Sequence, residues 1–68
     1  MDKIRIGARI KYFRELNNIS QSDLARSIDV DRTTLSHYES GFRLPNIFVL
    51  WKIADVMGIS IDELVGRK

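Results

Sequence analysis

Apolar residues recur along the chain at intervals of three or four positions, in segments that short polar residues and glycines interrupt. The first segment carries Ile6, Ile10 and Phe13 at helical spacing, which predicts a helix over about residues 4–17. The alternation of apolar and polar residues that is typical of a strand is not sustained anywhere. The pattern as a whole predicts an all-α fold of five helices.

The segment 20–41 has the features of two short helices joined by a tight turn. Ser20 is followed three residues later by Asp23, an arrangement typical of a helix start, because both side chains can bond free backbone N–H groups. The turn falls on residues 28–31, where the apolar side chain of Val30 is expected to point into the core.

The second helix of this pair is predicted over residues 32–40, with Asp31 as its N-cap and Gly41 at its end. At about 100° per residue, Leu35 and Tyr38 share one side of this helix. The opposite side carries polar, hydrogen-bonding side chains: Arg32, Thr33, Ser36, His37 and Ser40. Such side chains suit the major groove, where Arg reads guanine, the Thr methyl meets thymine, and His bonds a purine edge or a phosphate. The alternative is an ordinary solvated helix face, although such a face usually carries the better helix formers Glu and Lys.

Two further helices are predicted after Pro45, which keeps the preceding loop out of a continuous helix. Asn46 is the expected N-cap of a helix over residues 47–57, and Ser60 is the expected N-cap of a short last helix. The side chains of the longer helix that should face the core are Ile47, Leu50, Ile53, Ala54 and Met57. In the loop, Arg43 is either a phosphate contact or a free surface arginine.

Two aromatic residues lie on the side of the longer helix that should face water. Phe48 and Trp51 fall opposite the predicted core side, and Val65 can extend the same patch. Adjacent exposed aromatic residues indicate a contact surface, since Trp and Phe are typical of the centres of protein interfaces. We therefore expect a dimer interface here. The alternative is that the fifth helix or the tail covers these side chains within the monomer.

Sixty-eight residues predict one small domain over residues 1–68. No cysteine is present and there is one histidine, so we expect no disulfide, no metal and no cofactor. Without a membrane-spanning run or a signal-like start, we expect a cytoplasmic protein, and no separate small-molecule effector domain is visible. The net charge of +2 permits binding to nucleic acid. The predicted first helix carries basic residues of which some should be solvated and others could reach phosphates: Lys3, Arg5, Arg9, Lys11 and Arg14.

With these residues in place, the chain resembles the phage-repressor and Cro-like (XRE-type) helix-turn-helix family. The matching residues extend over nearly the whole chain: Ile6-Gly7-x-Arg9-Ile10, Gln21-x-x-Leu24-Ala25, Leu35-Ser36-x-Tyr38-Glu39-x-Gly41, Pro45, and Met57-Gly58-Ile59-Ser60-Ile61-Asp62-Glu63-Leu64. The resemblance implies a five-helix lambda-repressor-like DNA-binding domain, in which the second and third helices form the helix-turn-helix. It also implies homodimers on near-palindromic operators, often joined through the last two helices.

The resemblance implies roles for individual residues as well. Gln21 would bond a DNA phosphate, and Arg14 would pair with Glu39. The base contacts would come from Arg32, Thr33, Ser36 and His37. One departure is Asp29, at a position where the family usually has glycine because the turn often needs a left-handed backbone.

The function expected from the sequence is that of a sequence-specific DNA-binding transcriptional regulator, a repressor that binds double-stranded DNA as a homodimer. The alternative is a protein-interaction module, such as an antitoxin that also binds its own operator, with Phe48 and Trp51 contacting the partner. An enzyme is the weakest candidate, because Ser36 and His37 are adjacent but no third residue orients them.

Overall fold

Every helix of the described structure begins at a short polar side chain that accepts a backbone N–H group of the first helical turn. These N-caps are Asp2, Ser20, Asp31, Asn46 and Ser60. Such caps are local, since donor and acceptor lie two or three residues apart, and they define where each helix starts.

The computed structural model describes residues 2–67, so the end residues of the predicted domain lie outside the described part. The helices are α1 (Lys3–Leu16), α2 (Gln21–Ser27), α3 (Arg32–Ser40), α4 (Ile47–Met57) and α5 (Ile61–Val65). The predicted all-α, five-helix fold is confirmed. The predicted bounds of the third and fourth helices are the observed ones, whereas α1 starts and ends one residue earlier than predicted.

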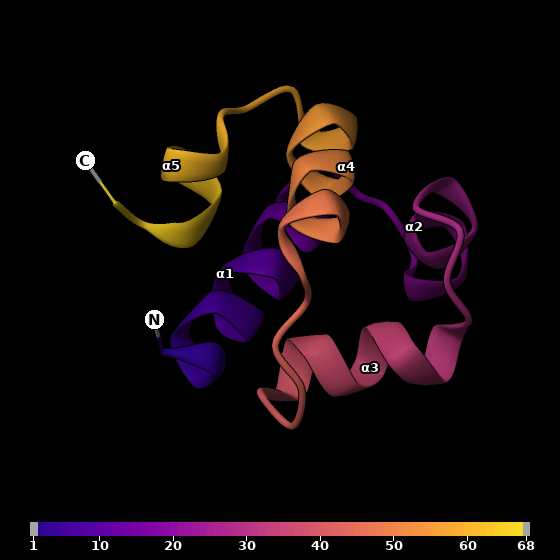
Figure 1. Cartoon of the computed structure of the whole chain (residues 1–68). Coiled ribbons are helices and arrows are strands. Elements are labelled where there is room, and N and C mark those ends of the chain that lie inside the picture. The colour runs from indigo at the N-terminus through magenta and orange to yellow at the C-terminus, as the bar shows by residue number, and fades with distance from the viewer. Residues whose placement is uncertain (1, 68) are drawn as a thin grey trace.

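Helix α1 packs against three of the other helices (Figure 1). It contacts α3, α4 and α5, while α2 packs against α3 and α4. The side chains buried between the helices form one core: Ile6, Ile10, Phe13, Leu24, Ala25, Ile28, Leu35, Tyr38, Leu50, Ile53, Ala54, Met57 and Leu64. Val30 packs against this core from the turn, as predicted. No helix within residues 2–67 combines the length and the apolar character needed to cross a membrane.

The crossing of α1 and α3 depends on a glycine. A Cβ atom built on Gly7 would lie 2.2 Å from the backbone oxygen of Tyr38 and 2.7 Å from that of Glu39. No side chain fits at such distances, so the backbones of the two helices approach closely only because residue 7 is glycine. This contact holds α3 against the rest of the molecule.

The prediction that Ile47 faces the core is wrong, because this residue is 53% exposed. Ile47 is the first residue of α4 and lies roughly 60° around the helix from Leu50, at the edge of the buried side. Ile47 precedes Trp51 by about one helical turn and so falls toward the same exposed side of α4. The half-buried Val49 packs against the core from the other edge.

Candidate nucleic-acid interface

The turn between α2 and α3 has the left-handed residue that the family pattern implied. Asp29 has φ of +62°, in a region that Asp tolerates better than most residues other than glycine. The N–H of Val30 donates to the carbonyl of Ala25 at 3.0 Å, and the N–H of Asp29 donates to that of Arg26 at 3.3 Å. These bonds close the end of α2 and direct the chain into α3.

Asp31 starts α3 and is itself fully exposed. Its Oδ1 accepts the N–H of Thr34 at 2.6 Å. This hydrogen bond, and a second one from the Thr34 side chain, lower the pKa of Asp31 below its ordinary value. The charged carboxylate thus lies at the positive end of α3, where a helix favours an anion.

Helix α3 has one buried side and one open side. Leu35 and Tyr38 are buried on the inner side. The opposite side, called here the α3 outer face, consists of Arg32, Thr33, Ser36, His37 and Ser40. All of these are exposed except His37, which is half-buried. The face therefore offers a guanidinium, three hydroxyls and an imidazole on a single helix.

An ion pair ties α1 to α3 behind this face. The Nε of Arg14 lies 2.6 Å from Oε2 of Glu39, and Nη2 of Arg14 donates to Oε1 of Glu39 at 3.2 Å. The side chains are 11% and 4% exposed, and the hydrogen bond with Glu39 raises the pKa of Arg14 above its ordinary value. The two residues that the family pattern pairs are thus in direct contact.

Gln21 extends this pair to the outer face. Its Nε2 donates to Oε1 of Glu39 at 2.9 Å, and its Oε1 accepts from Nε of Arg32 at 3.4 Å. A continuous chain of hydrogen bonds therefore runs from Arg14 on α1 to Arg32 on α3. Gln21 also lines a shallow recess of about 200 Å³, together with Arg32, Thr33 and Ser36. One amide N–H of Gln21 is used within the protein, which leaves its second amide hydrogen for a ligand at this recess.

Beside the C-terminal end of the α3 outer face lies Phe42, a loop residue that the sequence pattern did not single out. The rings of His37 and Phe42 have centroids 4.9 Å apart, at 57° to each other. Arg43, the next residue in the loop, is exposed, and its backbone N–H donates to the carbonyl of His37 at 3.2 Å. The signal available in the sequence was an aromatic residue directly after the helix-ending Gly41.

Two arginines of α1 bond to the end of α5, so their guanidinium groups are engaged within the molecule. Nε of Arg9 donates to the carbonyl of Leu64 at 2.9 Å, and Nη2 of Arg5 donates to that of Gly66 at 3.4 Å. These cations complement the negative C-terminal end of the helix. The other basic residues of α1 that could reach a ligand, Lys3 and Lys11, are exposed.

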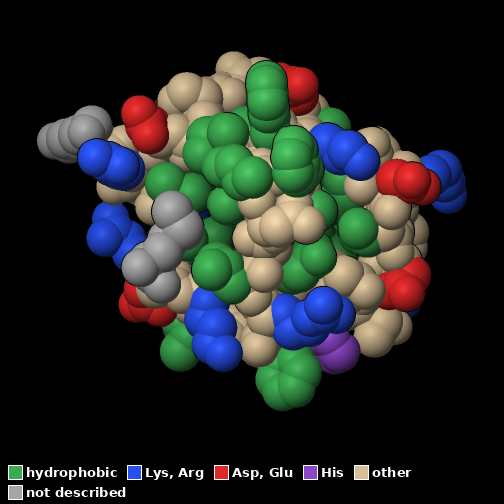
Figure 2. Space-filling view, in the orientation of Figure 1, with side chains coloured by type: hydrophobic (Ala, Val, Ile, Leu, Met, Phe, Trp, Pro, Cys, Tyr) green, Lys and Arg blue, Asp and Glu red, His purple; other side chains and the backbone are tan. Residues whose placement is uncertain are grey.

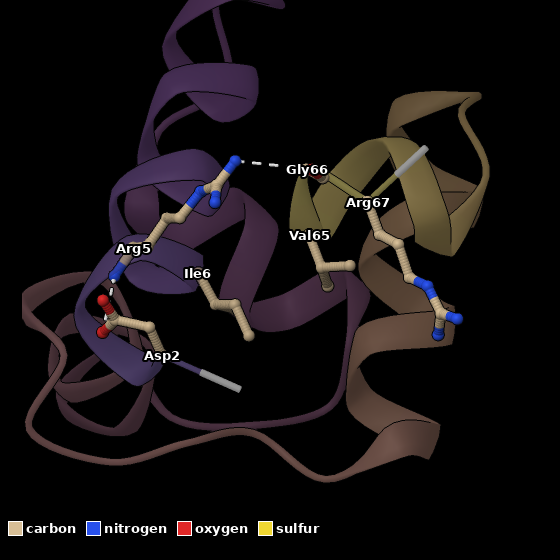
Figure 3. Close-up of a pocket in the computed structure, with 6 residues that line it drawn as sticks. All are labelled: Asp2, Arg5, Ile6, Val65, Gly66 and Arg67. Atoms are coloured by element: carbon tan, nitrogen blue, oxygen red, sulfur yellow. Dashed lines mark hydrogen bonds between the residues drawn. The ribbon is translucent and has the colours of Figure 1, made fainter.

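Beside these arginines lies an open pocket of about 410 Å³ between α1 and α5 (Figure 3). Ile6 and Val65 contribute its apolar surface, and Asp2, Arg5 and Arg67 contribute its charged groups. Val65 is half-buried and packs against the core, so it is less open than the two aromatic residues of α4 with which it was grouped.

The aromatic side chains of α4 are open to solvent. Phe48 is 69% exposed and Trp51 is 58% exposed, so α5 does not cover them. Ile47, also on α4, is exposed as well. Figure 2 shows hydrophobic side chains gathered on one face of the molecule, with Lys and Arg side chains around them. Within residues 2–67, no group of three or more His, Cys, Asp or Glu side chains is placed to hold a metal ion.

Known proteins share both this sequence pattern and this arrangement of helices. A helix-turn-helix family model matches residues 10–64. The transcriptional repressor RstR of the cryptic phage CTXphi, from Vibrio cholerae, is 42% identical over 64 residues, which are 94% of this chain and 57% of RstR. The chain thus spans little more than half of that relative.

Two solved structures share the fold over nearly the same length. The restriction-modification controller protein C.AhdI from Aeromonas hydrophila has a TM-score of 0.87 and 28% identity, over 93% of this chain and 96% of C.AhdI. SinR, a master regulator for biofilm formation solved in complex with DNA, has a TM-score of 0.81 and 34% identity, over 88% of this chain and 97% of SinR. The family match, these relatives and the geometry of α2 and α3 together show that this chain belongs to the XRE-type helix-turn-helix family of DNA-binding transcription regulators.

Proposed function

We propose that this protein is a sequence-specific transcriptional repressor that acts in the cytoplasm and inserts the N-terminal half of α3 into the major groove of an operator. The observation that carries the proposal is the exposed, polar α3 outer face. The close backbone contact between α1 and α3 at Gly7 fixes the position of this helix. The groove admits one helix, and its base edges offer donors and acceptors that such side chains can match.

Each side chain of the face has a chemical task in this proposal. Arg32 donates two hydrogen bonds to guanine, and Thr33 presents its methyl group to thymine. Ser36 and His37 contact base edges one turn further along the helix. Nε of Arg32 donates a hydrogen bond to Oε1 of Gln21. This bond orients the guanidinium group and so supports one direction of approach to guanine.

Phosphate contacts would set the register of the protein on the duplex. Gln21 lies at the start of α2 with one amide hydrogen uncommitted, and Arg43 lies exposed beyond the end of α3. Contacts of this kind position a protein without reading sequence.

The proposal includes a homodimer on a near-palindromic site. Phe48 and Trp51 support this part, because open aromatic side chains that pair across a two-fold axis would bury their apolar surface. Val65 would lie at the margin of the interface. Two α3 helices would then contact half-sites about 34 Å apart.

The test is selection of bound duplexes from a random pool, followed by titration of the selected duplex at rising salt. We expect one enriched near-palindromic sequence and an affinity that falls steeply and linearly with the logarithm of salt concentration. A pool without enrichment, or an affinity that salt barely changes, would contradict the proposed function.

A second candidate is a protein-interaction module, such as an antitoxin that also binds its own operator, and the exposure of Phe48 and Trp51 favours it. An interface built on these aromatic residues would depend little on salt, unlike the phosphate contacts of DNA binding. Salt titration therefore separates an interface with DNA from an interface with a protein partner, and the two can coexist in one chain.

A further inference from the structure

We propose that Phe42 is a positioning residue of the DNA interface, whose ring holds the His37 imidazole in place and so determines the base preference at the position that His37 contacts. The inference rests on the proposed function, since it assigns a role within the same interface. Phe42 lies outside α3, in the loop that leads to α4.

The loop is tied to the end of α3 by a closed set of hydrogen bonds. The Ser40 hydroxyl donates to the carbonyl of His37 at 3.2 Å and accepts the N–H of Phe42 at 3.3 Å. The N–H of Arg43 donates to the same His37 carbonyl, also at 3.2 Å. Gly41, at φ of +81°, makes the reversal of the chain possible. The backbone of Phe42 is therefore placed by α3 itself.

From this backbone, the Phe42 ring reaches the His37 ring and not the core. The centroid distance of 4.9 Å and the angle of 57° lie in the range of favourable aromatic contacts. Yet Phe42 remains 67% exposed, so burial in the core does not account for its position. In Figure 2 the histidine lies at the lower edge of the molecule, with a hydrophobic and a basic side chain beside it.

A contact of this kind matters because a free imidazole would have to be ordered when DNA binds. A side chain that is already held in its bound orientation avoids much of that loss of freedom. The ring of Phe42, 4.9 Å from that of the half-buried His37, restricts the imidazole before the duplex arrives. The remaining accessible edge of the imidazole is then presented in one orientation, which is what discrimination between bases requires.

The experiment uses the full chain and the duplex selected from the random pool, with a set of duplexes that each change one base pair. Binding is measured for the unmodified chain, His37→Ala, Phe42→Leu, the double variant, and Phe42→Tyr as the matched control that keeps a ring. Thermal unfolding verifies that each variant is folded. Proton NMR of the free proteins reports whether the imidazole protons keep the chemical shift caused by a neighbouring aromatic ring.

We expect His37→Ala to abolish the preference at one base pair, and Phe42→Leu to reduce that same preference several-fold while the other positions keep theirs. The double variant should resemble His37→Ala alone, and Phe42→Tyr should retain the preference. In the free protein, Phe42→Leu should shift the His37 imidazole resonances.

An unchanged base preference in Phe42→Leu, an equal loss of affinity on every duplex, or additive effects in the double variant would overturn the inference while the proposed function stood. A pool without any selected sequence would instead overturn the proposed function, and this inference with it. The two failures are thus distinguishable.

Discussion

At the level of single residues, the proposed DNA interface consists of side chains that hydrogen bonds to neighbouring residues orient. Arg32 is exposed, but its Nε bonds to Gln21, and Gln21 bonds to the buried Glu39. Glu39 in turn is held by Arg14 from another helix. A polar network of this kind orients its members only if each one finds its partner, since an unpaired buried charge would cost several kcal/mol. An exposed arginine is thereby connected to the core.

Replacing Arg32 with Ala should weaken binding to the selected duplex by about 1–3 kcal/mol and remove the preference at one base pair, because a bidentate contact with guanine is lost. Fluorescence anisotropy on the selected duplex and its single-base variants measures both effects. The control is Lys52→Ala, which removes an exposed basic residue of α4 and should leave base preference unchanged. An equal loss on every sequence would instead make Arg32 a phosphate contact.

At the scale of elements, each helix is started by its cap and oriented by contacts with other helices. The α3 cap is charged, and the lowered pKa of Asp31 shows that the folded state favours the carboxylate. A group whose pKa is lower in the folded state adds stability above its unfolded pKa, and this stability is lost as the pH falls through the folded value.

The stability that the charge of Asp31 adds should therefore be present at neutral pH and disappear below about pH 4, the ordinary pKa range of aspartate. Asp31→Asn is the matched variant, because Asn caps a helix about as well but carries no charge. Urea unfolding of both proteins across this range measures the difference. A gap between them that stayed constant down to pH 2 would contradict the assignment.

The crossing of α1 and α3 makes a second prediction at this scale. Gly7→Ala gains up to about 1 kcal/mol of helix propensity, yet the new Cβ atom would lie 2.2 Å from a backbone oxygen. Because backbone must move, we expect net destabilisation of about 1–3 kcal/mol, measured by chemical denaturation. Ala8→Ser, at the adjacent exposed position, should change stability by less than about 0.5 kcal/mol. A stabilised Gly7→Ala protein would show that the two helices can separate without cost.

At the scale of the whole molecule, the polar α3 outer face and the aromatic face of α4 are distinct surfaces. The first suits a charged, hydrated partner, and the second suits an apolar one. Ile47, Phe48 and Trp51 together expose far more apolar surface than one isolated side chain would. A protein that binds DNA with one surface and its own copy with the other would read two half-sites at once.

Trp51→Glu should therefore convert a dimer into a monomer at micromolar concentration. Loss of a central aromatic contact typically costs at least about 2 kcal/mol, or roughly 30-fold in the dimer dissociation constant. Analytical ultracentrifugation measures the mass, and binding to full and half operators should become nearly equal. Tyr12→Glu, which alters a 57% exposed aromatic residue of α1, is the control and should remain dimeric. A wild-type chain that is monomeric at these concentrations would contradict the dimer.

Features that depend on neighbours along the chain can be predicted from the amino-acid sequence. The bounds of α3 follow from Asp31 and Gly41, and those of α4 follow from Asn46 and Gly58, because caps and left-handed ends involve residues only a few positions apart. The polar side of α3, opposite Leu35 and Tyr38, follows from the helical period alone.

Features that depend on residues far apart in the sequence are fixed by how the helices and loops pack in three dimensions. Ile47 is exposed because no other element covers this residue, and Arg9 bonds to carbonyls of α5 that lie more than fifty positions away. The ring of Phe42 meets His37 because hydrogen bonds fold the loop back over α3. Periodicity describes one helix at a time, whereas these contacts depend on where the helices and the loop come to lie in space.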